Sequence, residues 1–294
     1  MDLRELRSFA AVARTGSFSR AAEQLYLGQP AVSQHVRRLE AELGLELFTR
    51  TTRAVALTDA GHVFLPRVQR ALAELDGGVA EIDEVRGLLR GHLTIGAMQW
   101  LDPYDLPQAL AAFRRNHPGI EITVVEQPTT AMVAGVLDES IDAAYVPLEE
   151  ERRGLDAHRL FTDDLVLIVG RDSPLAARAG LRFGALHDES FVFLREGSGL
   201  RRIIEEAARA AGFVPHAALE TNELARVFAL VAAGLGVSVV SRTVAERAHA
   251  DVALVPLRPT PRRTVGLVWR EDRRQPPAAR AFIEHVRGAA SLAA

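Results

Sequence analysis

Three short helices, separated by breaks of only a few residues, are predicted in the first 44 residues of the chain. Apolar residues recur at steps of three and four over 3–13, which predicts a helix with one buried face. Gly16 suits the end of this helix, and Ser17 suits the start of a second helix over 18–25. A third helix is expected over 30–43, because the proline that opens it is tolerated in a first helical turn. Two helices joined by a turn of about three residues are typical of a helix-turn-helix motif.

The third helix is predicted to have one buried side and one side that faces solvent. Its buried stripe consists of Val32, Val36, Leu39 and Leu43. Pro30, Gln34 and Arg37 lie opposite, Ser33 and Arg38 lie on the flanks, and His35 lies nearer the core. Amide and guanidinium groups on an exposed helix can read the edges of DNA bases. An ordinary solvated face would show the same pattern, so this helix alone leaves both interpretations open.

Two short β runs follow at 45–58 and predict a wing. Arg50 and Arg53 have no acidic neighbour between residues 49 and 58, so we expect them to reach phosphate groups. The stretches 14–38 and 49–58 together contain six arginines and one glutamate, although the whole chain carries a net charge of −3. The total charge therefore excludes a strongly basic protein, while one predicted surface is locally cationic.

Motifs in these sixty residues, taken in register, closely resemble the LysR-type transcriptional regulators. They are Ser17–Ala22, Gln29–Gln34, Arg38–Glu40, Leu43–Gly44, Leu47–Phe48 and Leu57–Gly61. The exposed face and the resemblance together indicate DNA contacts by Ser17, Ser19, Arg20, Gln29, Pro30, Ser33, Gln34, Arg37, Arg50 and Arg53. The chain departs from the family at Gly28, where the family usually has a serine that caps the recognition helix and touches phosphate. Glycine permits the same cap geometry, so we expect this chain to lack only the phosphate contact that the serine makes.

A long helix is predicted from Asp59 to about residue 90, with Thr58 as its cap. About thirty residues at 1.5 Å each give a rod of roughly 45 Å. Its apolar stripe comprises Phe64, Val68, Ala71, Leu75, Val79, Ile82, Val85 and Leu89. Such a stripe needs a partner, and the resemblance implies antiparallel pairing with a second subunit, often within a tetramer. We expect Phe64, Val68, Leu75, Val79 and Ile82 at this dimer seam, while Gly77-Gly78 suits either a hinge or close helix packing.

Strands and helices alternate after residue 91 and predict a parallel, doubly wound α/β sheet. Strands are expected at 92–97, 120–126, 141–146, 164–170, 191–194, 217–220, 236–240 and 265–269. Helices are expected at 103–116, 129–138, 199–211, 223–233 and 277–286. Two halves joined by crossings near 162–164 and 263–266 resemble the effector domain of the family, whose fold is similar to that of periplasmic solute-binding proteins.

Ligands of open α/β sheets bind at the carboxyl ends of the strands, which selects a set of loops. The residues selected there are Gln99, Trp100, Thr129, Ser198, Gly199, Thr221 and Asn222. Hydroxyl groups and free backbone N–H groups at three helix starts suit an anionic ligand, although ordinary capping explains any one of them alone. The family commonly has a small hydroxyl residue in place of Trp100. The indole either stacks on a planar effector or fills the pocket, and the sequence leaves both open.

Several classes of protein are excluded by what the sequence lacks. The chain contains no cysteine, which excludes disulfides, thiolate nucleophiles and thiol redox sensing. The histidines show no metal-ligand spacing, and there is no nucleophile–base motif, so we expect no enzyme activity, cofactor or metal. No stretch approaches the ~20 apolar residues of a membrane span. The N-terminus lacks the uninterrupted apolar segment of a signal peptide. We therefore expect a cytoplasmic protein with no membrane contact.

The predicted architecture is an α+β multidomain chain. It comprises a winged helix-turn-helix over 1–58, a linker helix over 59–90 and a two-lobed α/β effector domain over 91–294. Lobe I is expected at about 91–162 and 266–294, and lobe II at about 163–265. The function expected is sequence-specific promoter binding controlled by a small-molecule effector.

Two alternatives remain, a constitutive regulator with an occluded pocket and a solute-binding protein. The helix-turn-helix counts against the second. The expected partners are double-stranded promoter DNA, further copies of the chain and a small anionic or aromatic effector. The resemblance adds RNA polymerase as a candidate partner.

Overall fold

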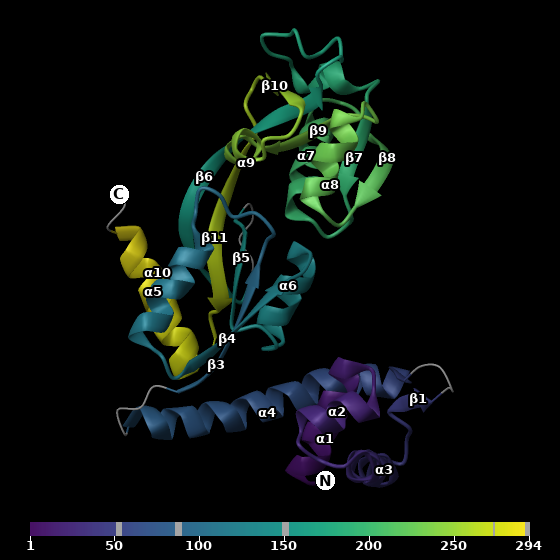
Figure 1. The fold of residues 1–294 in the computed structure, drawn as a ribbon, viewed down its shortest axis with the longest axis vertical. Coiled ribbons are helices and arrows are strands. Elements are labelled where there is room, and N and C mark those ends of the chain that lie inside the picture. The colour runs from purple at the N-terminus through teal and green to yellow at the C-terminus, as the bar shows by residue number, and fades with distance from the viewer. Residues whose placement is uncertain (51–54, 86–89, 149–152, 273, 292–294) are drawn as a thin grey trace. The chain divides into compact units, whose positions relative to one another are not determined.

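The computed structural model describes residues 1–50, 55–85, 90–148, 153–272 and 274–291 (Figure 1). Two compact units divide the chain, Met1–Leu88 and, for most of the remainder, Leu89–Leu137 with Ile141–Ala294. Among the described helices, none combines the length and the hydropathy needed to cross a bilayer.

Helices α1 (Leu3–Thr15), α2 (Phe18–Gln24) and α3 (Gln29–Leu43) form the first unit with strands β1 (Phe48–Arg50) and β2 (Val55–Leu57) and helix α4 (Asp59–Val85). Local signals in the sequence fix these boundaries. Gly16 ends α1 in the left-handed conformation, with φ 61°, and the hydroxyl of Ser17 caps α2. Thr58 Oγ1 accepts a hydrogen bond from the backbone N–H of Gly61 at 3.1 Å and so caps α4. The predicted helix-turn-helix and its antiparallel wing strands are therefore confirmed.

The first half of α4 completes the core of this unit. The ring of Phe9 lies 5.3 Å from that of Phe48 and 5.7 Å from that of Phe64, and Val68 is 2% exposed in the same cluster. Phe64 and Val68 were expected at a seam between subunits, but they pack within their own unit. The stripe changes role along the helix, because Leu75, Val79 and Ile82 are each more than half exposed.

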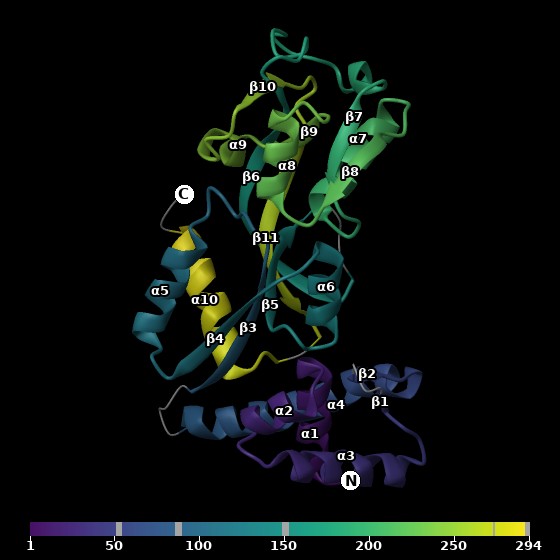
Figure 2. The same cartoon turned by 45° about the vertical axis from the view of Figure 1, so that its right-hand side comes forward.

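Lobe I of the second unit contains the parallel strands β3 (Gly91–Ala97), β4 (Ile120–Glu126) and β5 (Ala143–Pro147). Helices α5 (Leu106–Asn116) and α10 (Pro277–Ser291) lie together on one face of the sheet, and α6 (Thr129–Leu137) covers the other (Figures 1 and 2). The edge-to-face contact of Phe113 with Phe282, at 5.2 Å, lies in the core between the sheet and the first pair of helices.

Lobe II is built around β7 (Ser190–Leu194), β8 (His216–Thr221), β9 (Ser238–Ser241) and β10 (Val252–Pro256). Helix α7 (Gly199–Ala210) and the short 3₁₀ helix η1 (Phe183–Leu186) bury apolar residues in one cluster. Helices α8 (Leu224–Ala232) and α9 (Arg242–Arg247) bury theirs in another. The lobe thus has two apolar layers around its strands.

Two long strands, β6 (Leu155–Gly170) and β11 (Arg262–Arg270), connect the lobes and pair antiparallel (Figure 1). Strand β6 pairs with β11 up to Asp164 and then with β9 and β10 in lobe II. The predicted parallel pairing is therefore found for β3–β4, β3–β5 and β7–β8, whereas β6 and β11 add antiparallel pairs that were not predicted.

Other boundaries also differ from those expected. The first half of β6 was missed because 155–163 is rich in charged side chains, and β10 and α9 were not predicted. Helix α5 begins at Leu106, capped by Asp105, rather than at residue 103.

Candidate functional site: recognition helix and interlobe cleft

Helix α3 presents a polar face to solvent. Val32, Val36 and Leu39 are fully buried against the other helices, whereas Gln34 and Arg37 on the opposite side are exposed. His35 is half-buried, and its Nδ1 lies 2.8 Å from Ser8 Oγ, which accounts for its position nearer the core. The packing of α3 therefore leaves an amide and a guanidinium group side by side on a rigid helix.

The starts of α2 and α3 differ in how they are capped. Ser17 Oγ accepts a hydrogen bond from the backbone N–H of Arg20, whose guanidinium donates to the carbonyl of Thr15. Gly28 has the extended conformation of a cap, with φ −73° and ψ 141°, but contributes no side-chain hydrogen bond. Beyond it, Gln29 Nε2 donates to Ser33 Oγ at 3.2 Å.

The remaining predicted DNA contacts lie in two places. Ser19 and Pro30 are exposed near the starts of α2 and α3. Arg50 ends β1, but its side chain lies outside the described structure, and so does the whole of Arg53. The prediction that these two arginines reach phosphate therefore stays a prediction.

A cavity of about 330 Å³ lies between the two lobes of the second unit. The carboxyl ends of β3, β4 and β7 lead into its wall, as the rule for α/β sheets requires. The predicted residues that line it are Gln99, Trp100, Thr129, Ser198, Gly199 and Asn222. Thr221, also predicted, is not part of the lining, because its Oγ1 accepts a hydrogen bond from the backbone N–H of Glu223 at the turn into α8.

The cavity also has charged residues that sequence reasoning missed. Arg263 is 6% exposed on β11 and lines the cavity beside Ala97, Leu200 and Leu224. Exposed Arg195 and Glu126 lie in other parts of the lining. A signal for Arg263 was present, because the predicted crossing at 263–266 places a guanidinium where the two lobes meet.

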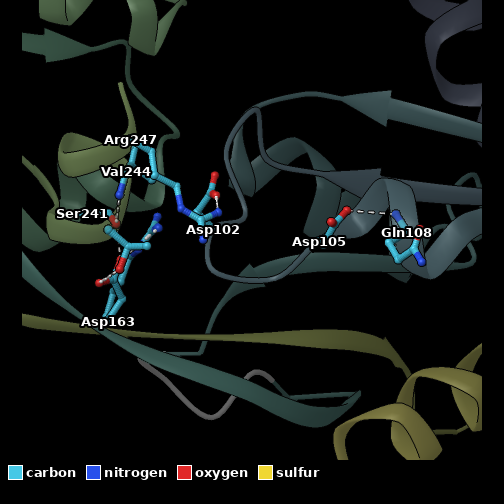
Figure 3. Close-up of polar contacts among 9 residues, drawn as sticks. Asp102, Asp105, Gln108, Asp163, Ser241, Val244 and Arg247 are labelled. Carbon is cyan, nitrogen blue, oxygen red and sulfur yellow. Dashed lines mark hydrogen bonds and ion pairs between the residues drawn. The ribbon is translucent and has the colours of Figure 1, made fainter. Parts of the chain in front are cut away.

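A buried carboxylate balances this guanidinium. Asp163 of β6 lies across from Arg263 in the strand register, and their side chains form an ion pair at 3.5 Å. Asp163 also accepts hydrogen bonds from the hydroxyls of Ser241 and, at 3.2 Å, Thr243. Ser241 Oγ in turn accepts from the backbone N–H of Val244 and caps α9 (Figure 3). The crossing point of the strands is thus tied to lobe II through Asp163.

One backbone N–H group at the start of each of two helices, α7 and α8, has an acceptor in lobe I. The backbone N–H of Gly199, which opens α7, donates to Thr129 Oγ1 at 3.2 Å. The backbone N–H of Leu224, which opens α8, donates to Gln99 Oε1 at 3.0 Å. Both acceptors belong to lobe I. One backbone N–H of the first turn of each helix is thus bound by lobe I, and the prediction that the remaining N–H groups there suit an anionic ligand stays a prediction.

Trp100 lies on the border of the cavity. Its indole is half-buried and packs against the apolar cluster of α8 and α9. A second hollow of about 270 Å³ lies beside it, lined by Phe228 and several alanines. Within the described residues, no group of three His, Cys, Asp or Glu side chains is arranged to hold a metal ion.

Two family models match the chain. The one described as "Bacterial regulatory helix-turn-helix protein, lysR family" covers residues 3–62. The one described as "LysR substrate binding domain" covers residues 86–291. Together they cover most of both compact units.

Similar proteins of known name agree with these matches. The chain is 34% identical over 290 residues to the RuBisCO operon transcriptional regulator of Allochromatium vinosum, covering 97% of this chain and 95% of that protein. It is 32% identical to the transcriptional dual regulator GltC of Bacillus subtilis, covering 97% and 96%.

Among solved structures, full-length OxyR of Pseudomonas aeruginosa has a TM-score of 0.74 and 29% identity, over 99% of this chain and 95% of that one. Full-length CbnR, solved in complex with its target DNA, has a TM-score of 0.69 and 25% identity, over 98% and 100%. The chain therefore belongs to the LysR family of transcriptional regulators, which are not enzymes, and it combines a DNA-binding helix-turn-helix with an effector-binding domain.

Proposed function

We propose that α3 enters the major groove of promoter DNA and that Gln34 and Arg37 read bases there. Gln suits adenine and Arg suits guanine, and both side chains are exposed on a helix whose other face is fixed in a core. The groups around the helix starts are the expected phosphate contacts, which set the register on the duplex. These are Ser17, Ser19, Arg20, Gln29, Pro30 and Ser33, with Arg50 and Arg53 of the wing.

The interlobe cleft is proposed to bind a small organic anion with a flat or aromatic body. The observation that carries this proposal is Arg263, a buried guanidinium on the cavity wall. Arg195 adds a positive charge and Glu126 a negative one at the surface of the cavity, while the buried carboxylate of Asp163 pairs with Arg263 from behind the lining. A cavity of about 330 Å³ lies at the lower end of the usual range for small-molecule sites, so the effector is expected to be compact.

The remaining assignments follow from these two sites. We assign 1–58 to DNA binding, 59–90 to the linker helix and 91–294 to effector binding. The exposed apolar end of α4 supports a dimer, which would present two recognition helices to successive major grooves, and pairs of dimers would form a tetramer. RNA polymerase is a further proposed partner, and the cytoplasm is the compartment in which promoter DNA is met.

Thermal denaturation with a set of small carboxylates tests the proposed effector class. A carboxylate at about 100 times its Kd stabilises the folded protein by about 2.7 kcal/mol, which a melting curve detects. We expect the carboxylate to raise the melting temperature of the wild type and of Arg262→Gln, but not that of Arg263→Gln. Arg262 is the control because its exposed guanidinium pairs with Asp164 in the wild type. An equal shift in both variants would exclude Arg263 as the anion contact.

A constitutive regulator with a blocked pocket is the second candidate, and the position of Trp100 favours it. Its indole occupies the border of the cavity and packs on lobe II. The variant Trp100→Ser separates the two functions, because it enlarges the space and adds a hydroxyl. If no carboxylate shifts the melting of the wild type or of Trp100→Ser, the constitutive function is supported.

A further inference from the structure

The loop that follows β3 is fixed to both lobes, and its contacts alternate along the chain. Leu101 is buried in the core of lobe I. Tyr104 packs against the same core, and its hydroxyl lies 3.2 Å from that of Tyr145. Burial raises the pKa of Tyr145 far above its usual value, so this contact stays between neutral phenols. Gln99 and Trp100 precede Leu101, and Asp102 lies between Leu101 and Tyr104. These three residues contact lobe II instead.

Gln99 makes two hydrogen bonds to the start of α8. Its Nε2 donates to the carbonyl of Asn222 at 3.2 Å, and its Oε1 accepts from the N–H of Leu224 at 3.0 Å. The cap residue of α8 itself, Glu223, makes no such bond, because its carboxylate accepts from Arg226 at 3.0 Å. The cap of a lobe II helix is therefore supplied by a side chain of lobe I.

Two further contacts hold the same loop on lobe II. The indole of Trp100 packs against the cluster that contains Leu224 and Phe228. Asp102 forms an ion pair with Arg247 of α9 (Figure 3). Three residues within a span of four thus contact α8 or α9, through an amide pair, an apolar contact and an ion pair.

We propose that Gln99, Trp100 and Asp102 form an internal latch that holds the two lobes together across the cleft. In the latch, Gln99 occupies the N-terminus of α8 on the wall of the cleft that is proposed as the effector site. The statement that Gln99 lies in the way of the effector rests on the proposed function, because it takes the cleft as the effector site. The effector must then displace Gln99, so the latch sets the concentration at which the regulator responds.

The chemistry of the contact suits a reversible latch. A helix N-terminus favours negative charge, and a hydrogen bond to a carboxylate is roughly twice as strong as one to a neutral amide. Gln99 is therefore a weaker cap than a carboxylate would be at the same position. An effector shifts the equilibrium only by its differential affinity for the two arrangements, and the latch supplies such a difference.

Tryptophan fluorescence tests the latch without any ligand. The chain has two tryptophans, and Trp269 is buried in lobe I, so a Trp269→Phe background leaves Trp100 as the single reporter. In that background we expect Gln99→Ala to shift the emission to the red and to raise acrylamide quenching about twofold. The matched control is Gln108→Ala, an exposed glutamine of α5 whose side chain lies on the surface of lobe I.

Hydrogen exchange in the otherwise unaltered full chain gives a second readout. Loss of a hydrogen bond of ordinary strength should make the amide of Leu224 exchange about fivefold faster in Gln99→Ala. Asp102→Asn, which weakens the latch without touching that bond, should raise exchange there less. Circular dichroism verifies that each variant is folded.

The outcomes separate the latch from the proposed function. Unchanged quenching in Gln99→Ala overturns the latch, even if exchange at Leu224 increases, because Gln99 would then only cap α8. Quenching and hydrogen exchange are both measured without ligand, so a negative carboxylate screen does not affect the test of the latch. Unchanged quenching, in turn, does not affect the proposal that the cleft binds an effector.

Discussion

The face of α3 and the wall of the cleft use their polar groups in opposite ways. Gln34 and Arg37 extend into solvent from a helix that is fixed by its buried side. In the cleft, Gln99, Thr129 and Arg263 bind other parts of the same chain. The polar groups of α3 thus face solvent, whereas these three polar groups of the cleft are bound within the same chain.

This difference follows from the environments of the two surfaces. Water solvates exposed side chains at little cost, so a DNA-reading face needs no internal partners. A polar group in a closed cleft loses that solvation and costs free energy unless it is hydrogen-bonded. Thr129 and Arg263, which are buried in the cleft wall, therefore need partners within the chain. Variants at both surfaces can break or sharpen this comparison.

The largest effect is expected from Asp163→Asn in the crossing strands. This change removes the carboxylate that pairs with the buried Arg263, and breaking a buried pair in this way costs about 3–5 kcal/mol. The neighbouring Asp164→Asn removes an exposed pair with Arg262 and should cost no more than about 1 kcal/mol. Calorimetry of the second unit's transition compares them, and equal losses would show that the buried pair has no special role.

Gln34→Ala should have the next largest effect, on DNA binding rather than on stability. A bidentate base contact contributes about 1–3 kcal/mol of discrimination, so affinity for the cognate site should fall roughly 10- to 100-fold. Random DNA should be bound nearly as before. Gln24→Ala, an exposed glutamine at the end of α2, is the matched control. Equal losses on cognate and random DNA would reject base reading.

A third variant, Leu75→Arg, tests whether the exposed apolar end of α4 binds a second subunit. A charge on an apolar seam prevents burial, so the mass measured by light scattering should fall about twofold. Glu74→Arg introduces the same side chain at the adjacent exposed position and should leave the mass unchanged. An unaltered oligomer in Leu75→Arg would place the interface elsewhere.

The smallest effect is expected from Gly28→Ser, which restores the residue usual in the family. Gly28 has a negative φ, and an added Cβ would meet Pro30 at 3.7 Å, an ordinary contact. Replacing a glycine cap by serine should stabilise α3 by about a few tenths of a kcal/mol. A new phosphate contact would tighten binding to cognate and random DNA alike, which filter binding measures. Tightening on the cognate site alone would argue against a phosphate contact.

Local patterns were enough to predict the first unit. Steps of three and four placed Val32 and Val36 inside and Gln34 outside, and Gly16 and Ser17 marked a real helix boundary. These features depend on interactions over a few residues, which a single sequence displays. The division of α4 was missed, because only the packing of Phe9 against Phe64 shows which half of the stripe is covered internally.

The sequence predicted where the cleft lies, but it did not predict which contacts the residues of the cleft make. The rule for strand ends selected Gln99 and Thr129, but their partners at Leu224 and Gly199 lie 125 and 70 residues away. The same distance in sequence hid the pairing of β6 with β11, whose polar residues resemble a loop until their partner strand is known. Such pairings are properties of the assembled fold.

The arrangement of β6 and β11 also fixes the order in which the lobes can be completed during synthesis. The chain enters lobe II along β6 and returns at the start of β11, where the N–H of Leu165 donates to the carbonyl of Pro261 at 2.8 Å. Lobe II is thus one continuous insertion, and all its strands exist once residue 261 has emerged from the ribosome. Lobe I needs Phe282 of α10 to complete its core and must wait until that residue has been synthesised. The lobe that begins first is therefore finished last, with its sheet exposed while lobe II folds.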